Sequence, residues 1–409
     1  MDASPNPPLD PDERRAFVEE ATAFLEDHAE RRPRAREAFA WGRGSGEVTL
    51  MGGAKVDEEE QLAAARAWRA MVYDAGFGWL SGPEEYGGAG RHPDLDHIYR
   101  GVEAEFVVPD QSAWGVAWEM VAPAVLAHGS EALKKHFLPR LFRGELLCSQ
   151  LLSEPEAGSD LAGLRTRAVR DGDEWVVNGQ KVWSSYAHKA DIGQLMARTD
   201  PDVPKHRGLT MFLLPMHAPG VEARPLRQMN GNAEFNEVFL TDARVPDANR
   251  VGEPGSGWRA VLTTLMSERA AVGSGKTSPA LDATRMLFEL AKHNDRTADL
   301  RVRERLAEVH THRNLIRWLT MRAEEAVAAG RERGAEGSLV KLLSSRQNRR
   351  IAELAGVLLG PAMTADTGEW GTYTWAHYLC STPAMRIAGG TDEIQHNILA
   401  ERVLGLPRD

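Results

Sequence analysis

The chain has 409 residues, of which 42% are hydrophobic, and this length exceeds what one hydrophobic core usually holds. Its 49 basic and 59 acidic residues give a net charge of −10, and the absence of a dense Lys/Arg tract argues against binding to nucleic acid or an anionic membrane. The first residues lack the apolar centre of a signal peptide, and no apolar run approaches the ~18 residues of a membrane span, which predicts a cytoplasmic protein.

Three regions follow one another along the chain. Residues 1–145 have apolar spacings of three and four, which predict helices around 17–25, 62–72, 97–106 and 133–141. Residues 146–252 contain short alternating or β-branched runs separated by Gly and Pro, which predict an antiparallel, barrel-like sheet. Residues 253–409 return to helical spacing, with helices expected at 300–329, at 337–359 and after Thr391. The predicted fold class is multidomain α+β, in the order helical, β, helical.

The segment LLSEPEAGSD, from Leu151 to Asp160, is predicted to form a loop that presents backbone donors. Pro155 keeps the residue before it extended, and Gly158 permits a tight bend in front of Ser159. Such a loop can direct several N–H groups at an anion or a ring oxygen. An ordinary surface loop explains the pattern equally well.

The following segment, EWVVNGQKVW, contains two apolar runs joined by Asn178-Gly179, a strong signal for a β-hairpin. We therefore expect a turn at this dipeptide. Because strand side chains alternate, Trp183 and Ser185 are expected on one face of the second strand. A hairpin with a packed Trp is the simpler alternative.

These two segments resemble the flavin-contacting segments of the acyl-CoA dehydrogenase family. Further blocks at 82–90, 231–252 and 388–408 resemble that family in the same order, so that the resemblance spans nearly the whole chain. It implies a helical domain, a β-barrel-like domain and a helical bundle. It also implies bound FAD, an acyl-CoA or other acyl thioester as substrate, an electron-transfer flavoprotein as electron acceptor, and a homodimer or homotetramer.

The chemistry implied by the resemblance is removal of a proton from the α carbon of the thioester, with hydride transfer from the β carbon to flavin N5. It requires a carboxylate base whose pKa is tuned by burial and neighbouring charges. Many members carry this base just before the Gly-Thr that opens the last helix, where this chain has Gly389. Other members, including those acting on branched chains, carry it on the first long C-terminal helix, where Glu268 aligns.

Helical spacing gives an independent reason to single out Glu268. It lies at the edge of an apolar stripe, and Arg269 falls within the stripe. The stripe consists of Trp258, Val261, Leu262, Leu265 and Met266. An internal ion pair is the alternative explanation for charges in this position. We expect Glu268 to be the base and Arg269 to hold or polarise the thioester.

The resemblance implies roles for other residues. Leu152 and Ser153 would contact the flavin pyrimidine edge, Gly158 would shape the cofactor loop, and Ser159 would contact the pyrophosphate and substrate. Further implied cofactor contacts are Trp183 and Ser185 near N5, the dinucleotide contact Gly360, and Thr391 and Glu393 at a helix start, where plain capping is the alternative. The N–H of Gly389 would hold the thioester carbonyl. Tyr86 would line the acyl pocket, although a surface turn explains it as well.

Departures from the family pattern leave alternatives open. The usual Arg followed by Phe-Gly, which reaches the adenosine diphosphate end of the flavin, is missing, and His293 and Arg296 are the nearest substitutes. One alternative is a non-catalytic or half-site subunit of a heteromer. A flavin-dependent oxygenase or oxidase of the same fold is a second alternative.

Other signals are set aside. The GSGKT segment at 273–277 is not a phosphate-binding P-loop, because Ala270 replaces the first required Gly and a helix precedes it. His310 and His312 face different directions on a helix, so no metal site is expected. Cys148 and Cys380 are too few and too far apart for a disulfide framework, and both are expected to be buried.

Overall fold

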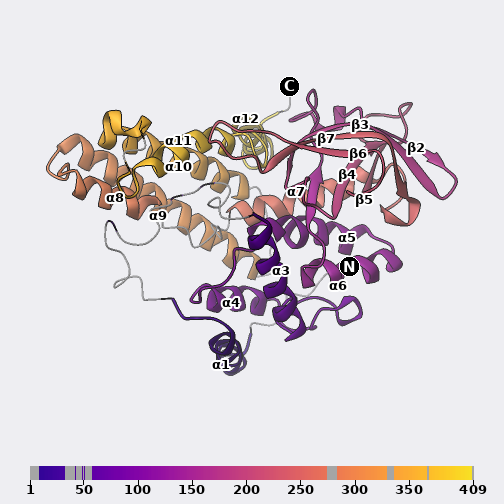
Figure 1. Ribbon diagram of the computed structural model, residues 1–409, viewed down its shortest axis with the longest axis horizontal. Coiled ribbons are helices and arrows are strands. Elements are labelled where there is room, and N and C mark those ends of the chain that lie inside the picture. Colours follow the sequence, from indigo (N-terminus) through magenta and orange to yellow (C-terminus); the bar gives the residue numbers. More distant parts are fainter. Residues whose placement is uncertain are drawn as a thin grey trace.

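A computed structural model of the chain describes residues 9–32, 42, 48, 50, 58–273, 283–328, 336–365 and 368–407. The N-terminal helices lie against one side of a β-sheet, and the C-terminal helices extend away from it (Figure 1). The expected fold class is confirmed. In the described part of the chain, no helix is both long and apolar enough to cross a membrane, and no group of three His, Cys, Asp or Glu side chains is arranged to hold a metal ion.

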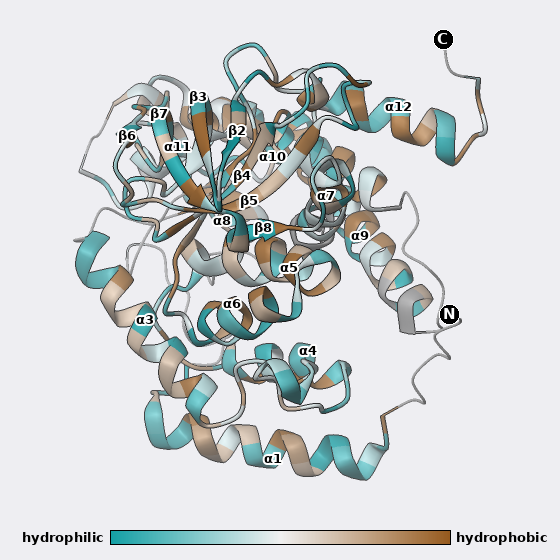
Figure 2. Cartoon of the chain, turned by 90° about the vertical axis from the view of Figure 1, so that its right-hand side faces the viewer, coloured by the Kyte–Doolittle hydropathy of each residue, from teal (hydrophilic) through white to brown (hydrophobic). Residues whose placement is uncertain are grey.

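A capping residue defines where the first helix begins. Asp10 accepts a hydrogen bond from the Asp12 N–H (2.8 Å), and Pro11 takes the first helical position, where its missing N–H costs nothing. Figure 2 shows hydrophilic and hydrophobic residues alternating along the first two helices, as one-sided burial requires. The helices are α1 (Pro11–His28), α3 (Glu58–Asp74), α4 (Asp94–Glu103), α5 (Ala122–His128) and α6 (Glu131–Arg143), with short turns η1 (Glu84–Tyr86), η2 (Ser112–Trp114) and η3 (Val116–Val121).

The sheet has the order β6-β7-β3-β2-β4-β5-β8, and β1 pairs with β4. Most pairs are antiparallel, but β1 runs parallel to β4, which differs from a wholly antiparallel sheet. The strands are β1 (Cys148–Leu151), β2 (Arg167–Asp171), β3 (Glu174–Ser185), β4 (Ile192–Arg198), β5 (Leu209–Pro215), β6 (Val221–Pro225), β7 (Phe235–Pro246) and β8 (Arg250–Val251).

The expected hairpin at Asn178-Gly179 is wrong. Both residues lie inside β3, which pairs with β7 on either side of a register shift at this point. The Asn178 side chain accepts a hydrogen bond from the Asp242 N–H of β7 (2.9 Å). It therefore stabilises a β-bulge at the register shift and not a turn. The real hairpin joins β2 to β3 at Gly172, which has φ +66°. Tertiary pairing thus overrides the local turn signal.

The C-terminal helices are α7 (Gly257–Gly273), α8 (Ala283–His293), α9 (Leu300–Ala328), α10 (Glu336–Leu359), α11 (Thr372–Met385) and α12 (Asp392–Arg402), with η6 (Gly360–Thr364) after α10. The helices expected at the positions of α9, α10 and α12 are confirmed. The GSGKT segment lies outside the described residues beyond Gly273, where α7 ends. Cys148 is buried as expected, whereas Cys380 on α11 is only half-buried.

One hydrophobic core joins the N-terminal helices, the sheet and α7. Buried Leu138 of α6, Met211 of β5 and Val261 of α7 belong to the same cluster. Two hydrogen bonds add direction to this packing: Gln194 Nε2 of β4 donates to Thr264 Oγ1 (2.9 Å), and His128 Nε2 of α5 bonds Thr263 Oγ1 (2.8 Å). The position of α7 is therefore determined from both sides.

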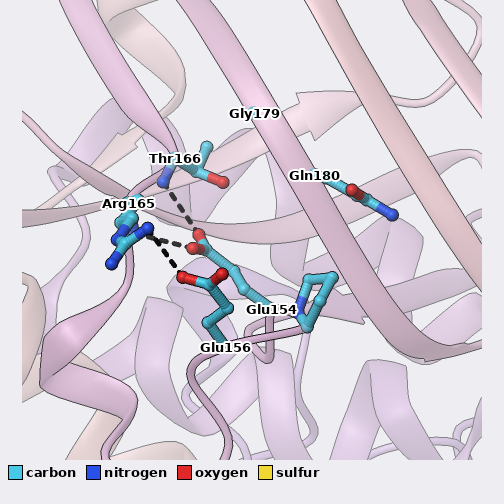
Figure 3. A pocket seen from close by; sticks show the side chains of 7 residues that line it. Glu154, Glu156, Arg165, Thr166, Gly179 and Gln180 are labelled. Carbon is cyan, nitrogen blue, oxygen red and sulfur yellow. Dashed lines mark hydrogen bonds and ion pairs between the residues drawn. The ribbon is translucent and has the colours of Figure 1, made fainter.

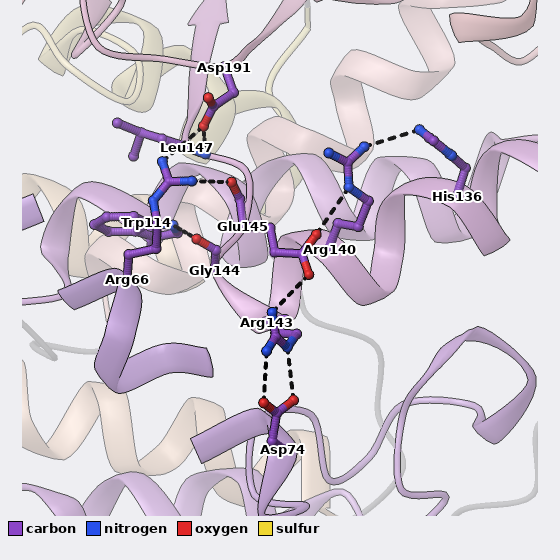
Figure 4. Close-up of polar contacts among 10 residues, drawn as sticks. All are labelled: Arg66, Asp74, Trp114, His136, Arg140, Arg143, Gly144, Glu145, Leu147 and Asp191. Carbon is purple, nitrogen blue, oxygen red and sulfur yellow. Dashed lines mark hydrogen bonds and ion pairs between the residues drawn. The ribbon is translucent and has the colours of Figure 1, made fainter. Parts of the chain in front are cut away.

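A polar network ties α3 and α6 to the first strand of the sheet (Figure 4). Arg143 forms a bidentate ion pair with Asp74 (2.8 Å for both bonds) and also bonds Glu145 (3.0 Å). Arg66 of α3 reaches Asp191 (3.1 Å), whose carboxylate also accepts from the N–H of Leu147 (2.8 Å). This network joins the start of β1 to the helices beneath it.

Gly179→Ala is expected to destabilise the chain, because the added Cβ would lie 2.7 Å from Thr166 Cα. Overpacking of this kind costs about 1–3 kcal/mol. Urea denaturation followed by circular dichroism measures the free energy of unfolding. Gly101→Ala on α4, where a Cβ meets nothing within 4 Å, is the matched control and should be neutral or slightly stabilising. Equal effects of the two substitutions would contradict the close approach.

Candidate active site

A buried ion pair anchors the LLSEPEAGSD loop to the sheet. Lys181 of β3 is completely buried, and its Nζ donates to Glu154 Oε1 (2.9 Å) and to the carbonyl of Leu152 (3.0 Å). The Glu154 carboxylate also accepts from the N–H groups of Arg165 (2.6 Å) and Thr166 (2.9 Å) (Figure 3). One carboxylate therefore joins the start of the loop, the residues after it, and the neighbouring strand.

Burial sets the electrostatics of this pair. It lowers the pKa of Lys181 to about 8, although the Glu154 charge opposes the change. Burial alone would raise the pKa of Glu154, but the Lys181 charge and the hydrogen bonds from Thr166 and Arg165 hold it below its usual range. Glu154 is thus a carboxylate at neutral pH, and a lysine opposite it is the only charged partner that the contacts provide within the described residues.

The loop itself turns sharply between its anchored ends. Glu154 and Ala157 exchange backbone hydrogen bonds (3.1 Å each), and the Val182 N–H donates to the Ser153 carbonyl (2.9 Å). Leu152 is buried and Ser153 half-buried, whereas Gly158 and Ser159 are exposed. The anchored half therefore faces the sheet, and the Gly158–Ser159 half remains accessible to a ligand.

The end of β3 has a strained backbone. Trp183 (φ +63°) and Tyr186 (φ +53°) both adopt the left-handed conformation, which bulky residues rarely do. Asn236 Nδ2 holds this end by donating to the carbonyls of Ser184 and Glu234 (3.0 Å each). Trp183 is 60% exposed, Ser184 is buried and Ser185 is half-buried, so that Trp183 and Ser185 are both more accessible than the residue between them.

Glu268 and Gly389, which are far apart in the sequence, meet in the structure. A methyl group placed on Gly389 would lie 3.6 Å from Glu268 Oε1. Glu268 is half-buried near the end of α7. Gly389 has φ +67°, and no described residue accepts a hydrogen bond from its N–H. A carboxylate and an available backbone donor thus lie side by side.

The turn that contains Gly389 is held from behind. Gln395 Nε2 of α12 donates to the carbonyls of Gly389 (2.9 Å) and Gly390 (3.2 Å). Buried Asp392, in the first turn of α12, accepts from Lys341 Nζ (3.0 Å) and Arg386 Nε (2.9 Å). Burial would raise the pKa of Asp392, but its hydrogen bonds and these two cations lower it below the usual range.

The remaining predicted residues lie in several places. Thr391 caps α12 by accepting from the Ile394 N–H (3.2 Å). Hydrogen bonds from the Glu393 backbone N–H and from the Thr391 side chain lower the pKa of Glu393. Gly360 (φ +54°) directly follows the last residue of α10 and begins η6. Tyr86 is buried and donates to Glu131 Oε2 (2.7 Å), which raises the Tyr86 pKa to about 12.

The other predicted residues are charged side chains of the C-terminal helices. Arg269 lies in α7, but its side chain falls outside the described part of the structure. The stripe beside it is only partly buried, because Val261 is inaccessible whereas Met266 is 57% exposed. Arg296 pairs with Asp299 (2.8 Å), and His293 is the last residue of α8.

Sequence reasoning missed Lys181 and its pairing with Glu154. The signal was present, since alternation along the strand puts Lys181 on the same side as the apolar residues Trp175 and Val177, where a lysine would be buried and would need a carboxylate. No sequence pattern predicted that Asn236 would hold the backbone next to Trp183. It depends on the register between β3 and β7, which pairs Ser184 with Asn236.

Comparison with known proteins places the chain in a family. Models of the N-terminal, middle and C-terminal domains of acyl-CoA dehydrogenases match residues 11–145, 149–243 and 255–404. Acyl-CoA dehydrogenase IpdE1 of Mycobacterium tuberculosis is 39% identical over 354 residues, which are 86% of this chain and 90% of that protein. Acyl-CoA dehydrogenase FadE34 of the same organism is 41% identical over 296 residues, 72% of this chain but 40% of that longer protein.

Solved structures show the same likeness. The Tcur3481-Tcur3483 steroid ACAD superposes with a TM-score of 0.74 at 25% identity, covering 98% of this chain and 99% of that one. The ChsE4-ChsE5 complex from Mycobacterium tuberculosis gives a TM-score of 0.71 at 28% identity, covering 100% of both chains.

Lys181→Met should destabilise the chain by about 3–5 kcal/mol, because it leaves the Glu154 carboxylate buried without a cation. The double substitution Glu154→Gln with Lys181→Met removes both charges and should recover part of this loss. Urea denaturation of the single and double variants gives the coupling free energy. Additive losses would show that the two groups do not act as a pair.

Protonation of Asp392 at acidic pH should lower the free energy of unfolding, because the protonated side chain no longer forms ion pairs with Lys341 and Arg386. Its folded pKa lies below its unfolded value of about 4, so its contribution is present above pH 4 and is lost as the pH falls through the folded pKa. Asp392→Asn should therefore flatten the rise in unfolding free energy between about pH 3 and 5. Asp12→Asn, at an exposed surface pair, is the control and should leave the profile nearly unchanged.

Proposed function

This chain belongs to the acyl-CoA dehydrogenase family, and we propose that it oxidises an acyl-CoA to the 2-enoyl thioester with FAD as the hydride acceptor. The single observation that carries the proposal is that Glu268 lies beside Gly389: a Cβ atom placed on Gly389 would be 3.6 Å from Glu268 Oε1. It puts a candidate base beside a candidate donor for the thioester carbonyl.

The residues of the LLSEPEAGSD loop and of the end of β3 suit FAD. Exposed Gly158 and Ser159 offer backbone and hydroxyl donors next to an anchored loop. Trp183 presents an exposed indole on a strained backbone, and the neighbouring Ser184 Oγ is buried without a partner among the described residues. We assign the flavin ring contacts to Leu152, Ser153, Trp183 and Ser185, and further contacts to Gly158, Ser159, Gly360, Thr391 and Glu393. Bound FAD would supply the hydride acceptor.

The protein's own groups would carry the proton transfer and the charge stabilisation. Glu268 takes the proton from the α carbon, since this half-buried residue has its carboxylate beside Gly389, the proposed donor to the thioester. The Gly389 N–H donates to the thioester carbonyl and stabilises the negative charge that develops on its oxygen. Arg269 would act at the thioester end, and Tyr86 at the acyl pocket. The electrons would pass to an electron-transfer flavoprotein.

The acyl group is proposed to be branched or bulky, because the base is on α7 rather than at position 389. Likeness to a protein described as a steroid ACAD supports including a ring-bearing thioester among the candidates. Gly389 lacks a side chain, which leaves space beside Glu268 that a second carboxylate would occupy.

Assembly with other subunits completes the proposal. A homodimer or homotetramer is the first expectation. A specific observation favours a heteromer as the second candidate: the chain resembles a structure described as a complex of two differently named proteins, ChsE4 and ChsE5. In that case the missing Arg and Phe-Gly contacts would come from a different chain. Flavin content per subunit and native mass of the purified protein distinguish the two assemblies.

Glu268→Gln should reduce the rate of flavin bleaching by an acyl-CoA about 10²–10⁴-fold, because the base is lost while the cofactor contacts remain. The measurement is anaerobic stopped-flow absorbance with straight, branched and ring-bearing acyl-CoAs.

Glu253→Gln, at an exposed carboxylate before α7, is the matched control and should bleach at the wild-type rate. The flavin absorbance before mixing must be equal in all three proteins. Rapid bleaching by the Glu268→Gln protein would exclude Glu268 as the base.

A further inference from the structure

A pocket of about 290 Å³ is lined by three arginines and a proline, Arg165, Arg167, Arg198 and Pro201. It adjoins a second pocket of about 250 Å³ that shares Arg165 and is drawn in Figure 3. A lining without any carboxylate is notable on a chain whose net charge is −10. Neither pocket contains Glu268 or Gly389.

Strand pairing brings like charges together here. Arg167 is the residue opposite Arg198 in the parallel bridge between β2 and β4. From Leu164 to Val169 burial alternates, so that Arg165 and Arg167 both lie on the exposed side. Like charges opposite each other destabilise a sheet, so this arrangement does not serve folding.

The positive charge of the pocket is only partly neutralised. Arg165 pairs with Glu156 (2.6 Å). Arg198 donates to the main-chain carbonyls of Ala162 (2.7 Å), Leu164 (3.3 Å) and Lys205 (3.2 Å), which orient its guanidinium without cancelling its charge. Arg167 has no hydrogen bond or ion pair to any described residue. An excess of positive charge therefore faces the pocket.

The pocket is also connected to the anchored loop. The N–H of Arg165 donates to Glu154, the carboxylate that pairs with Lys181. Asp160 at the end of the loop pairs with Lys205 (2.8 Å), and the Lys205 carbonyl accepts from Arg198. Two of the three arginines, Arg165 and Arg198, are thus held in place by contacts to the loop of the candidate active site, directly or through Lys205.

We propose that this arginine pocket binds a phosphate group of the coenzyme A that carries the acyl group. Guanidinium groups bind phosphate oxygens through paired N–H donors, and three of them around one pocket suit a multiply charged phosphate ester. The inference rests on the proposed function only in taking coenzyme A as the carrier. Its thiol end would lie toward Gly389, and its phosphate end would lie at Arg165, Arg167 and Arg198.

The test is the affinity of the FAD-loaded protein for free coenzyme A, measured by isothermal titration calorimetry. Arg167→Gln should weaken binding about tenfold, the loss expected for one charge-assisted hydrogen bond. Arg170→Gln removes the same charge from the same strand outside the pocket lining and should bind as the wild type does. The thermal midpoint of the Arg167→Gln protein should stay equal or rise, which a purely structural role would not produce.

Dephospho-coenzyme A identifies the phosphate. If Arg167→Gln weakens coenzyme A but not dephospho-coenzyme A, the pocket binds the 3′-phosphate; if it weakens both, the pocket binds the diphosphate. Either result supports the proposal. Unchanged affinity of Arg167→Gln, an equal loss in Arg170→Gln, or loss of FAD instead of coenzyme A would overturn it. Free coenzyme A has no acyl group to oxidise, so the result is independent of Glu268 and of flavin bleaching.

Discussion

The buried ion pair between Lys181 and Glu154 is the constraint on which the candidate site depends. A lysine without solvent exposure requires a charged partner, and Glu154 provides one by bringing the start of the LLSEPEAGSD loop onto β3. The same carboxylate accepts two backbone N–H groups from the chain after the loop. Both ends of the loop are therefore fixed, and its middle is free to present donors outward.

A second buried cluster, around Asp392, holds the turn that contains Gly389. Asp392 joins Lys341 of α10 to Arg386 at the end of α11, and this places the Gly389–Gly390 turn between them. The two clusters lie in different regions of the chain. Helix α7 connects them, because it contacts α10 and shares a hydrophobic core with the N-terminal helices and the sheet. Glu268 is carried on this helix, so core packing determines where the candidate base lies.

Much of the fold follows from local patterns. The strands and the long C-terminal helices were expected from hydrophobic spacing, because alternation and 3.6-residue periodicity report which side of an element is buried. The Asn178-Gly179 turn was not real, since β3 gains more from continuous pairing with β7 than from a hairpin. The left-handed backbones of Trp183 and Tyr186 were equally unforeseen. They are held by Asn236, whose position depends on strand register rather than on neighbouring residues.

The sequence by itself determined the order of helical and β regions, the family resemblance, and the identity of Glu268 as the carboxylate to consider. These features depend on residue type and short-range spacing, which a linear pattern retains. Only the tertiary structure decided that Glu268 lies beside Gly389, that Lys181 pairs with Glu154, and that Arg165, Arg167 and Arg198 surround one pocket. Each of these is a contact between segments far apart in the chain or in facing strands. Such contacts arise when the hydrophobic core brings the segments together, and local propensity carries no record of them.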